Sequence, residues 1–274
     1  MWKSCCFPQA EPVYFCTEEF SAMNKTVLIT GATSGIGEAC AKKFAANGFN
    51  IGITGRRNDR LQQLKNTLEQ SYNIQCATAC FDVRNREEVS TAINTLHNEL
   101  GTIQVLVNNA GLALGRSYFD ESDRNDWDVM IETNINGLLN TSMATIPFMI
   151  KQGGGHIINI GSVAGKEVYE KGNVYCATKF AVDAITKSQR IDLMRHKIKV
   201  TGIHPGAVET EFSLVRFKGD KDTADSIYKG FTPLTAEDVA ETVYFSATLP
   251  PHVCINELTV TCAQQANAWF FMKE

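Results

Sequence analysis

The sequence has few of the residues that build metal centres and disulfide frameworks. Its five histidines are scattered, and its nine cysteines do not form the short pairs with nearby histidines that bind zinc, so we predict no metal site. The number of cysteines is odd, and several lie in apolar segments such as "IQCATACF". This pattern favours buried, reduced thiols in a cytoplasmic protein over a disulfide framework.

The sequence also lacks an excess of positive charge and a long apolar run. A net charge of −4 argues against non-specific binding to nucleic acid or to an anionic membrane surface. No apolar run approaches the ~20 residues that a bilayer span needs. Residues 1–22 contain two prolines and three acidic residues and lack the apolar stretch of a signal peptide. We interpret them as a loose extension, or as an over-long start before Met23.

From residue 25 onward the sequence alternates short apolar runs with amphipathic stretches. The apolar runs have the composition of buried strands, and they lie at 25–31, 50–55, 74–83, 103–111, 155–162, 197–206 and 256–261. Helical patterns separate them. This alternation predicts an α/β fold, a Rossmann-like doubly wound parallel sheet of about seven strands with helices on both faces. No linker or change of composition divides residues 23–274, so we expect a single domain.

A glycine-rich turn, "TGATSGIGEA" at 30–39, follows the first predicted strand and opens the first predicted helix. Gly31, Gly35 and Gly37 would let the backbone turn tightly and approach a pyrophosphate, which the helix N-terminus would also attract. The spacing G-x-x-x-G-x-G differs from the G-x-G-x-x-G dinucleotide fingerprint. A plain tight turn is the alternative, but the position between strand and helix favours a dinucleotide site.

The end of the second predicted strand indicates which dinucleotide binds. An acidic residue there would accept hydrogen bonds from the ribose of NAD, whereas arginines would pair with the 2′-phosphate of NADP. In "IGITGRRNDR", Gly55 ends the strand, and Arg56 and Arg57 follow it. The arginines could simply solvate a loop. Because no carboxylate stands at the tip of the strand, we predict NADP.

Tyr175 and Lys179 lie four residues apart in "GNVYCATKFAVDAITK", which places them on one face of a predicted helix. In a poorly solvated cleft the ammonium would favour the phenolate and lower the pKa of Tyr175. The phenol could then donate and accept a proton near neutral pH. A half-buried helix whose Tyr and Lys tips reach water would show the same spacing. The pair alone therefore does not distinguish a catalytic helix from an ordinary one.

Four further motifs support a catalytic interpretation: "NNAG" at 108–111, Asn134 in "ETNING", Ser162 in "NIGSVAG" and "PG" at 205–206. With these motifs, the glycine turn and Tyr175-x-x-x-Lys179, residues 25 to about 262 resemble the short-chain dehydrogenase/reductase family. The resemblance rests on the order and spacing of the motifs, because each alone is weak. It implies an oxidoreductase that moves hydride between a nicotinamide and a carbon bearing a hydroxyl or carbonyl oxygen.

The resemblance implies a role for each matching residue. Tyr175 matches the proton donor and acceptor, and Lys179 matches the lysine that lowers its pKa and holds the nicotinamide ribose. Ser162 matches the hydroxyl that steadies the reacting oxygen, and Asn134 matches the residue that holds a water between the lysine and solvent. The residues expected to bind the cofactor are Gly31, Thr33, Ser34, Gly35, Ile36, Gly37, Arg56, Arg57, Asp82, Val83, Asn109, Ala110, Gly111, Tyr175, Lys179, Pro205, Gly206, Val208 and Thr210.

The stretches "EFSLVRFKGD" and "TLPPHVCIN" are similar to the branch of the family that oxidises serine, allo-threonine and other 3-hydroxy acids with NADP. Such an acid would react between Ser162 and Tyr175, and its carboxylate needs a cation, which Arg216 or Lys218 could supply. Solvent exposure or a subunit contact is the alternative for these two cations. The segment 163–173, which should border the substrate mouth, carries more charge than that branch usually shows.

Two other functions stay open at this stage. The enzyme could instead act on a bulkier ketone, sugar or lipid carbonyl. It could also be a cofactor-sensing binding protein without turnover, although its Ser, Tyr and Lys set is complete. Members of the family commonly pair through the helices that correspond to 123–151 and 173–196, so we expect a homo-oligomer, either a dimer or a tetramer.

Overall fold

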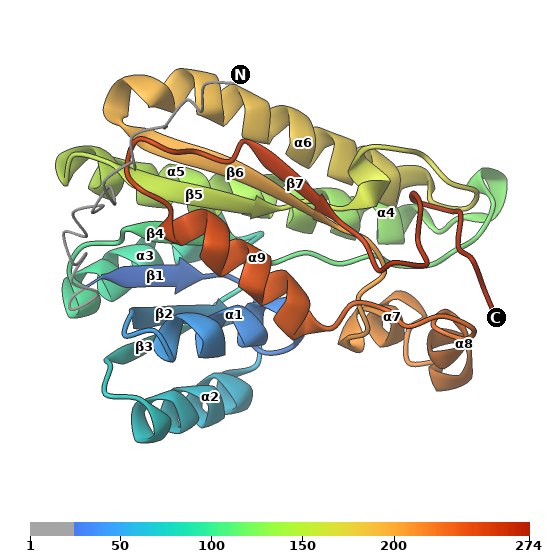
Figure 1. The fold of residues 1–274 in the computed structure, drawn as a ribbon, viewed down its shortest axis with the longest axis horizontal. Helices are drawn as coiled ribbons and strands as arrows, with labels where there is room; N and C mark the ends of the chain where they lie inside the picture. The colour runs from blue at the N-terminus through green and yellow to red at the C-terminus, as the bar shows by residue number, and fades with distance from the viewer. Residues whose placement is uncertain (1–24) are drawn as a thin grey trace, which may run out of the picture.

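A single parallel sheet forms the centre of the molecule, seen in a computed structural model that describes residues 25–274 (Figure 1). The interpretation of residues 1–22 lies outside this described part. The seven strands lie in the order β3-β2-β1-β4-β5-β6-β7, and every neighbouring pair is parallel. They are β1 (Thr26–Ile29), β2 (Asn50–Gly55), β3 (Cys76–Cys80), β4 (Val105–Asn108), β5 (Gly155–Ile160), β6 (Ile198–Pro205) and β7 (Glu257–Val260).

Helices connect successive strands, as parallel pairing requires. They are α1 (Gly35–Ala45), α2 (Asn58–Ser71), α3 (Arg86–Leu100), α4 (Arg124–Ile131), α5 (Gly137–Lys151), α6 (Asn173–Leu193), α7 (Glu211–Arg216), α8 (Lys221–Ser226) and α9 (Ala236–Thr248). A π-helical turn, Glu132–Asn136, joins α4 to α5, and a 3₁₀ turn, Val163–Gly165, follows β5. The predicted doubly wound α/β fold of about seven strands is confirmed.

The helices form two layers, one on each face of the sheet (Figure 1). Helices α1, α2 and α9 bury one apolar cluster against the sheet, in which Phe44 packs edge-to-face with Phe49 and Tyr244. On the other face, α3 and α5 bury a second cluster, and α6 lies over β5 and β6. No helix within residues 25–274 is long and apolar enough to cross a membrane.

The strand order reverses between β1 and β4, which are neighbours in the sheet but not in the chain. In open α/β sheets the connections leave in opposite directions at such a point, and a crevice opens beyond the carboxyl ends of the strands. The glycine turn follows β1 and "NNAG" ends β4, so the topology brings both predicted cofactor motifs to this crevice.

Candidate active site

A cleft of about 340 Å³ lies at the carboxyl ends of the strands and contains most of the residues predicted from the sequence. Of the predicted cofactor residues, all but Gly37 line it. Ser162 lines it as well, whereas Asn134 and Arg216 are not among the lining residues. Residues that sequence reasoning did not single out also line the cleft, and among them are Leu112, Glu211, Phe212 and Val215.

The glycine turn is packed too closely to accept side chains. Gly31 and Gly35 have positive φ angles of 67° and 54°, which L-residues with a Cβ rarely adopt. A Cβ atom at Gly31 would lie 2.9 Å from the Cα of Ala110, and one at Gly37 would lie 2.5 Å from the carbonyl oxygen of Gly31. Asn109 fixes this approach, because its side-chain amide donates to the carbonyl oxygens of Thr30 and Gly31. Backbone therefore lines this part of the cleft, as a dinucleotide site requires.

The cationic side chains at the tip of β2 suit a phosphate group. Arg57 donates to the hydroxyl oxygens of Thr33 (2.8 Å) and Ser34 (2.9 Å), so cation and hydroxyl groups share one place beside the glycine turn. Arg56 is more exposed and lies 3.9 Å from the carboxylate of Asp82. Hydroxyl and guanidinium donors at this position fit the 2′-phosphate of NADP. Arg60, in the first turn of α2, donates to the carbonyl oxygen of Thr33 at 3.4 Å and was not predicted.

Tyr175 and Lys179 lie one turn apart on α6 and are both buried, with 8% and 7% of their surfaces exposed. The Lys179 ammonium donates to the carbonyl oxygen of Ile160, at the end of β5, at 3.0 Å. Ser162 follows two residues later and begins the 3₁₀ turn, where its oxygen accepts from the amide of Ala164. The fold thus brings the three predicted reactive groups to one wall of the cleft.

The pKa of Tyr175 differs from the sequence-based expectation. Burial raises it above its ordinary value, with a further contribution from Tyr169, and hydrogen bonding from Ser162 and the nearby charge of Arg216 act against this. The net shift is upward because desolvation of the phenolate dominates, and the expected lowering by Lys179 stays a prediction. Burial also lowers the pKa of Lys179, to about 8.

Asn134 lies in the π-helical turn and is buried. Its Nδ2 donates to the carbonyl oxygen of Leu112 and to the hydroxyl of Thr178, and its Oδ1 accepts from the amide of Leu112. These bonds tie the segment after β4 to α6. The side chain stands behind Gly111, where a Cβ would be 3.2 Å from Asn134 Oδ1 and 3.7 Å from Lys179 Nζ. Asn134 is thus near the lysine, and the expected water-holding role stays a prediction.

Arg216 lies against the ring of Tyr175. Its guanidinium carbon lies 5.5 Å from the ring centroid of Tyr175, Nη1 donates to the Tyr169 hydroxyl at 3.0 Å, and Nε donates to the carbonyl oxygen of Gly115. Lys218 instead pairs with Asp126 at 2.9 Å and is largely exposed. Of the two cations considered from the sequence, only Arg216 lies beside Tyr175.

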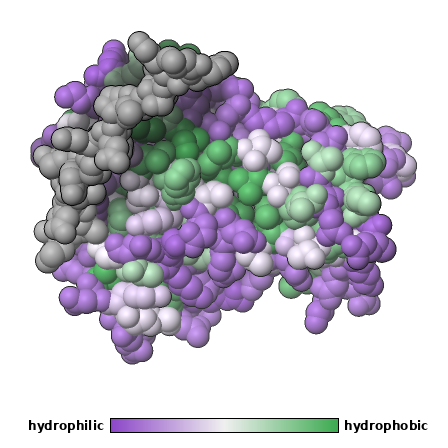
Figure 2. All heavy atoms as spheres, viewed as in Figure 1, coloured by the Kyte–Doolittle hydropathy of each residue, from purple (hydrophilic) through white to green (hydrophobic). Residues whose placement is uncertain are grey.

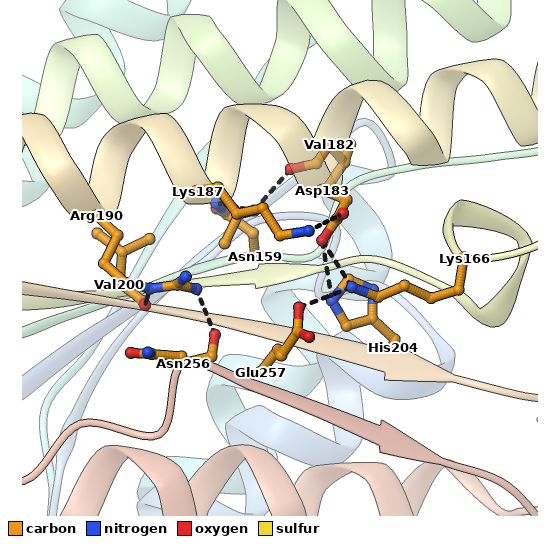
Figure 3. A network of polar contacts seen from close by, with 11 residues as sticks. Asn159, Lys166, Val182, Asp183, Lys187, Arg190, Val200, His204, Asn256 and Glu257 are labelled. Carbon is orange, nitrogen blue, oxygen red and sulfur yellow. Dashed lines mark hydrogen bonds and ion pairs between the residues drawn. The ribbon is translucent and has the colours of Figure 1, made fainter.

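Lys166, in the charged segment 163–173, forms ion pairs with two neighbouring elements. Lys166, just after the 3₁₀ turn, bonds to the carboxylates of Asp183 on α6 (2.8 Å) and Glu257 on β7 (2.7 Å), over the buried ring of His204 (Figure 3). Asp183, His204 and Glu257 could together hold a metal ion, but the Lys166 ammonium already supplies positive charge between the two carboxylates. The Lys166 ammonium therefore joins the turn after Ser162 to α6 and β7.

The parallel sheet, the phosphate turn and the buried Ser, Tyr and Lys side chains define a dinucleotide-dependent oxidoreductase. Comparison with known proteins identifies its family. Residues 25–220 match the model of the short chain dehydrogenase family, and the chain belongs to this family.

The chain is similar to several characterised proteins over most of its length. It is 45% identical to sulfoacetaldehyde reductase 2 of Chromohalobacter salexigens over 89% of this chain and 96% of the relative. It is also 45% identical to the NADP-dependent 3-hydroxy acid dehydrogenase YdfG of Escherichia coli strain K12, over 88% and 96%. A solved structure, the closed form of serine dehydrogenase complexed with NADP+, matches with a TM-score of 0.84 and 44% identity, over 91% and 99%.

Proposed function

We propose that this short-chain dehydrogenase uses NADP to interconvert a small hydroxy acid, or a close analogue with another anionic head group, and the corresponding carbonyl compound. The position of Arg216 beside Tyr175 carries the proposal, because it puts a fixed cation next to the proton-transferring group. The relatives named above act on 3-hydroxy acids, serine or sulfoacetaldehyde. In 3-hydroxy acids and sulfoacetaldehyde, one methylene separates the anionic head from the reacting carbon.

The proposed chemistry divides between the cofactor and the chain. NADP, when bound, supplies or accepts the hydride. Tyr175 exchanges the proton of the substrate oxygen, and the Ser162 hydroxyl donates to that oxygen as negative charge develops on it. Lys179, with a pKa near 8, is largely protonated at neutral pH and adds positive charge behind the tyrosine. The guanidinium of Arg216 grips the carboxylate or sulfonate and so orients the carbon.

The phosphate-binding part of the proposal rests on Arg57, Thr33 and Ser34. These groups would hold the 2′-phosphate of NADP, and the glycine turn would hold the pyrophosphate. Because a bare ribose hydroxyl gains nothing from the guanidinium charge, we expect NADPH to bind more tightly than NADH. Equal dissociation constants for the two cofactors would contradict this assignment.

A substrate panel tests the hydroxy acid assignment. We expect turnover with NADP and serine, 3-hydroxypropionate or 2-hydroxyethanesulfonate to exceed that with a cyclic alcohol of similar size, read as absorbance at 340 nm. In Arg216→Ala, KM for the acids should rise about tenfold or more, as expected when a charge-assisted bond is lost, while uncharged alcohols are unaffected. Lys218→Ala is the matched control. Preferred turnover of a bulky uncharged alcohol would instead favour the alternative, an enzyme of ketones, sugars or lipids.

We propose a homo-oligomer in the cytoplasm, with α5 and α6 as its interface. Large apolar side chains are exposed on these helices, and they are Leu139, Met143, Ile150, Phe180 and Ile191. Apolar residues also gather on the face that carries α9 and β7 (Figure 2), which gives a dimer a second surface for forming a tetramer. Light scattering would measure the mass. A monomer at micromolar concentration would contradict the proposal.

A further inference from the structure

Glu211, the first residue of α7, pairs with two arginines beside the glycine turn. Its Oε2 accepts from Arg57 Nη1 at 2.9 Å, and its Oε1 accepts from Arg60 Nη1 at 2.7 Å. The three side chains are between 39% and 41% exposed, so ions from solution can reach them. Arg57 and Arg60 hold the pKa of the Glu211 carboxyl below its usual value, so the group is an anion at neutral pH.

The rest of the Arg57 guanidinium is turned toward the glycine turn. Nε and Nη2 donate to the Thr33 hydroxyl, and Nη2 also donates to the Ser34 hydroxyl. One carboxylate, two hydroxyls and the carbonyl oxygen of Thr33 therefore accept hydrogen bonds from this guanidinium. An anionic phosphate that binds at the tip of β2 needs the same cation, and it also meets the repulsion of the Glu211 charge.

Glu211 belongs to the segment that reaches the catalytic tyrosine. Its neighbour Phe212 lies 5.7 Å from Tyr175, measured between ring centroids, and Arg216 at the other end of α7 lies over the same ring. Thr210, which caps α7, stands against the phosphate turn, because a Cβ at Gly35 would lie 3.2 Å from it. The start of α7 is therefore held at the cofactor arginines, and its end is held at the substrate side.

We propose that the Glu211 carboxylate is an internal substitute for the 2′-phosphate. It pairs with Arg57 and Arg60 and must release them when NADP binds. The inference rests on the proposed use of NADP. It makes Glu211 a residue that sets cofactor preference, since its carboxylate opposes NADP and leaves NAD unaffected. It also assigns Arg60 to the phosphate site, and it links arrival of the phosphate to release of the start of α7.

Equilibrium binding of NADPH and NADH, without substrate, tests the proposal. In Glu211→Gln the dissociation constant of NADPH should fall about three- to tenfold. This is the change expected when one or two part-exposed ion pairs no longer compete with the 2′-phosphate for the arginines. The dissociation constant of NADH should stay unchanged. Glu209→Gln, which removes the same charge from an exposed position two residues earlier, should change neither constant.

Other results would overturn the inference. Unchanged NADPH binding in Glu211→Gln would make the two ion pairs incidental, and weaker binding would mean that Glu211 orients the arginines for the phosphate. If the wild type binds NADH as tightly as NADPH, the proposed use of NADP is wrong. That result differs from an unchanged NADPH dissociation constant in Glu211→Gln, so the two proposals can be rejected separately. Hydrogen exchange at residues 210–216 gives a second measurement: NADPH should speed exchange there relative to NADH, and equal exchange would exclude the release of α7.

Discussion

The ammonium of Lys179 donates to the carbonyl oxygen of Ile160 at 3.0 Å, which joins α6 to the end of β5. The side chain reaches this carbonyl through a poorly solvated space, and burial lowers the pKa of the amine to about 8. Folding therefore favours the neutral amine more than the unfolded chain does.

The first prediction concerns the stability of the protein as a function of pH. The folded pKa of Lys179 is below that of the unfolded chain, so the unfolded state binds more protons between about pH 8 and 10.5. In this window wild-type stability should rise with pH relative to Lys179→Met, by on the order of 3 kcal/mol in total. Urea unfolding of both proteins at pH 7 and 10 measures it, and Lys187→Met, at an exposed lysine on the same helix, is the control. A constant difference would show that the amine is solvated.

The second prediction separates proton transfer from cofactor binding. Tyr175→Phe keeps the buried ring against Phe212 but removes the only hydroxyl of the side chain. We expect turnover to fall by about 10²–10⁴-fold, as when a general acid is removed, with an unchanged NADPH dissociation constant. Tyr244→Phe, on α9 at the opposite face, should keep full turnover. Substantial activity in Tyr175→Phe would move the proton donor to another group.

The residues of the cleft that were predictable from the sequence share a local signal. Gly31 and Gly35 adopt positive φ, and their spacing after an apolar strand marks the turn. Tyr175 and Lys179 share a face because helix geometry fixes residues four apart. In each case the pattern and the function lie within one strand, turn or helix, so the sequence suffices.

The residues that were missed depend on long-range contacts. Glu211 meets Arg57 and Arg60 across more than 150 positions of the chain. Nothing near Glu211 in the sequence indicates this contact. Arg60 does stand in the arginine-rich stretch that was interpreted as a 2′-phosphate site. The π-helical turn at Asn134 was also unpredictable, because the apolar pattern of 123–151 continues through it. The pKa of Tyr175 depends on how completely the fold excludes water from the phenol. The four-residue spacing of Tyr175 and Lys179 carries no information about that.

A third prediction tests the close packing of the phosphate turn. A methyl group in Gly37→Ala would lie 2.5 Å from the carbonyl oxygen of Gly31 and 2.5 Å from Asn109 Nδ2, so backbone would have to move. We expect a loss of stability of about 1–3 kcal/mol and weaker binding of both NADPH and NADH. Calorimetric titration measures the binding, and Ser90→Ala, at an exposed position of α3, is the control. Unchanged binding would mean that the turn does not contact the cofactor.

A fourth prediction concerns Lys166, which joins the turn after Ser162 to Asp183 on α6 and Glu257 on β7 (Figure 3). Lys166→Met leaves two carboxylates facing each other over His204 without their shared cation. We expect a loss of about 1–2 kcal/mol of stability at pH 7 and a lower kcat, because the turn after Ser162 is no longer held to α6 by this ion pair. Lys166→Arg should restore both, and Lys187→Met, which removes the exposed partner of Asp183, should change little.

Acidification should narrow the stability difference between wild type and Lys166→Met. Burial, then the charge of Lys166, lowers the pKa of His204 to about 4, against the opposing charges of Asp183 and Glu257. The unfolded chain therefore binds more protons between pH 6.5 and 4, and the wild type loses stability as pH falls through this window. Without Lys166 the folded pKa of His204 rises, so the variant loses less. Urea unfolding at pH 7 and 5, with the His204 titration followed by NMR, measures both effects. A difference that widens toward pH 5 would show that Lys166 does not act on His204.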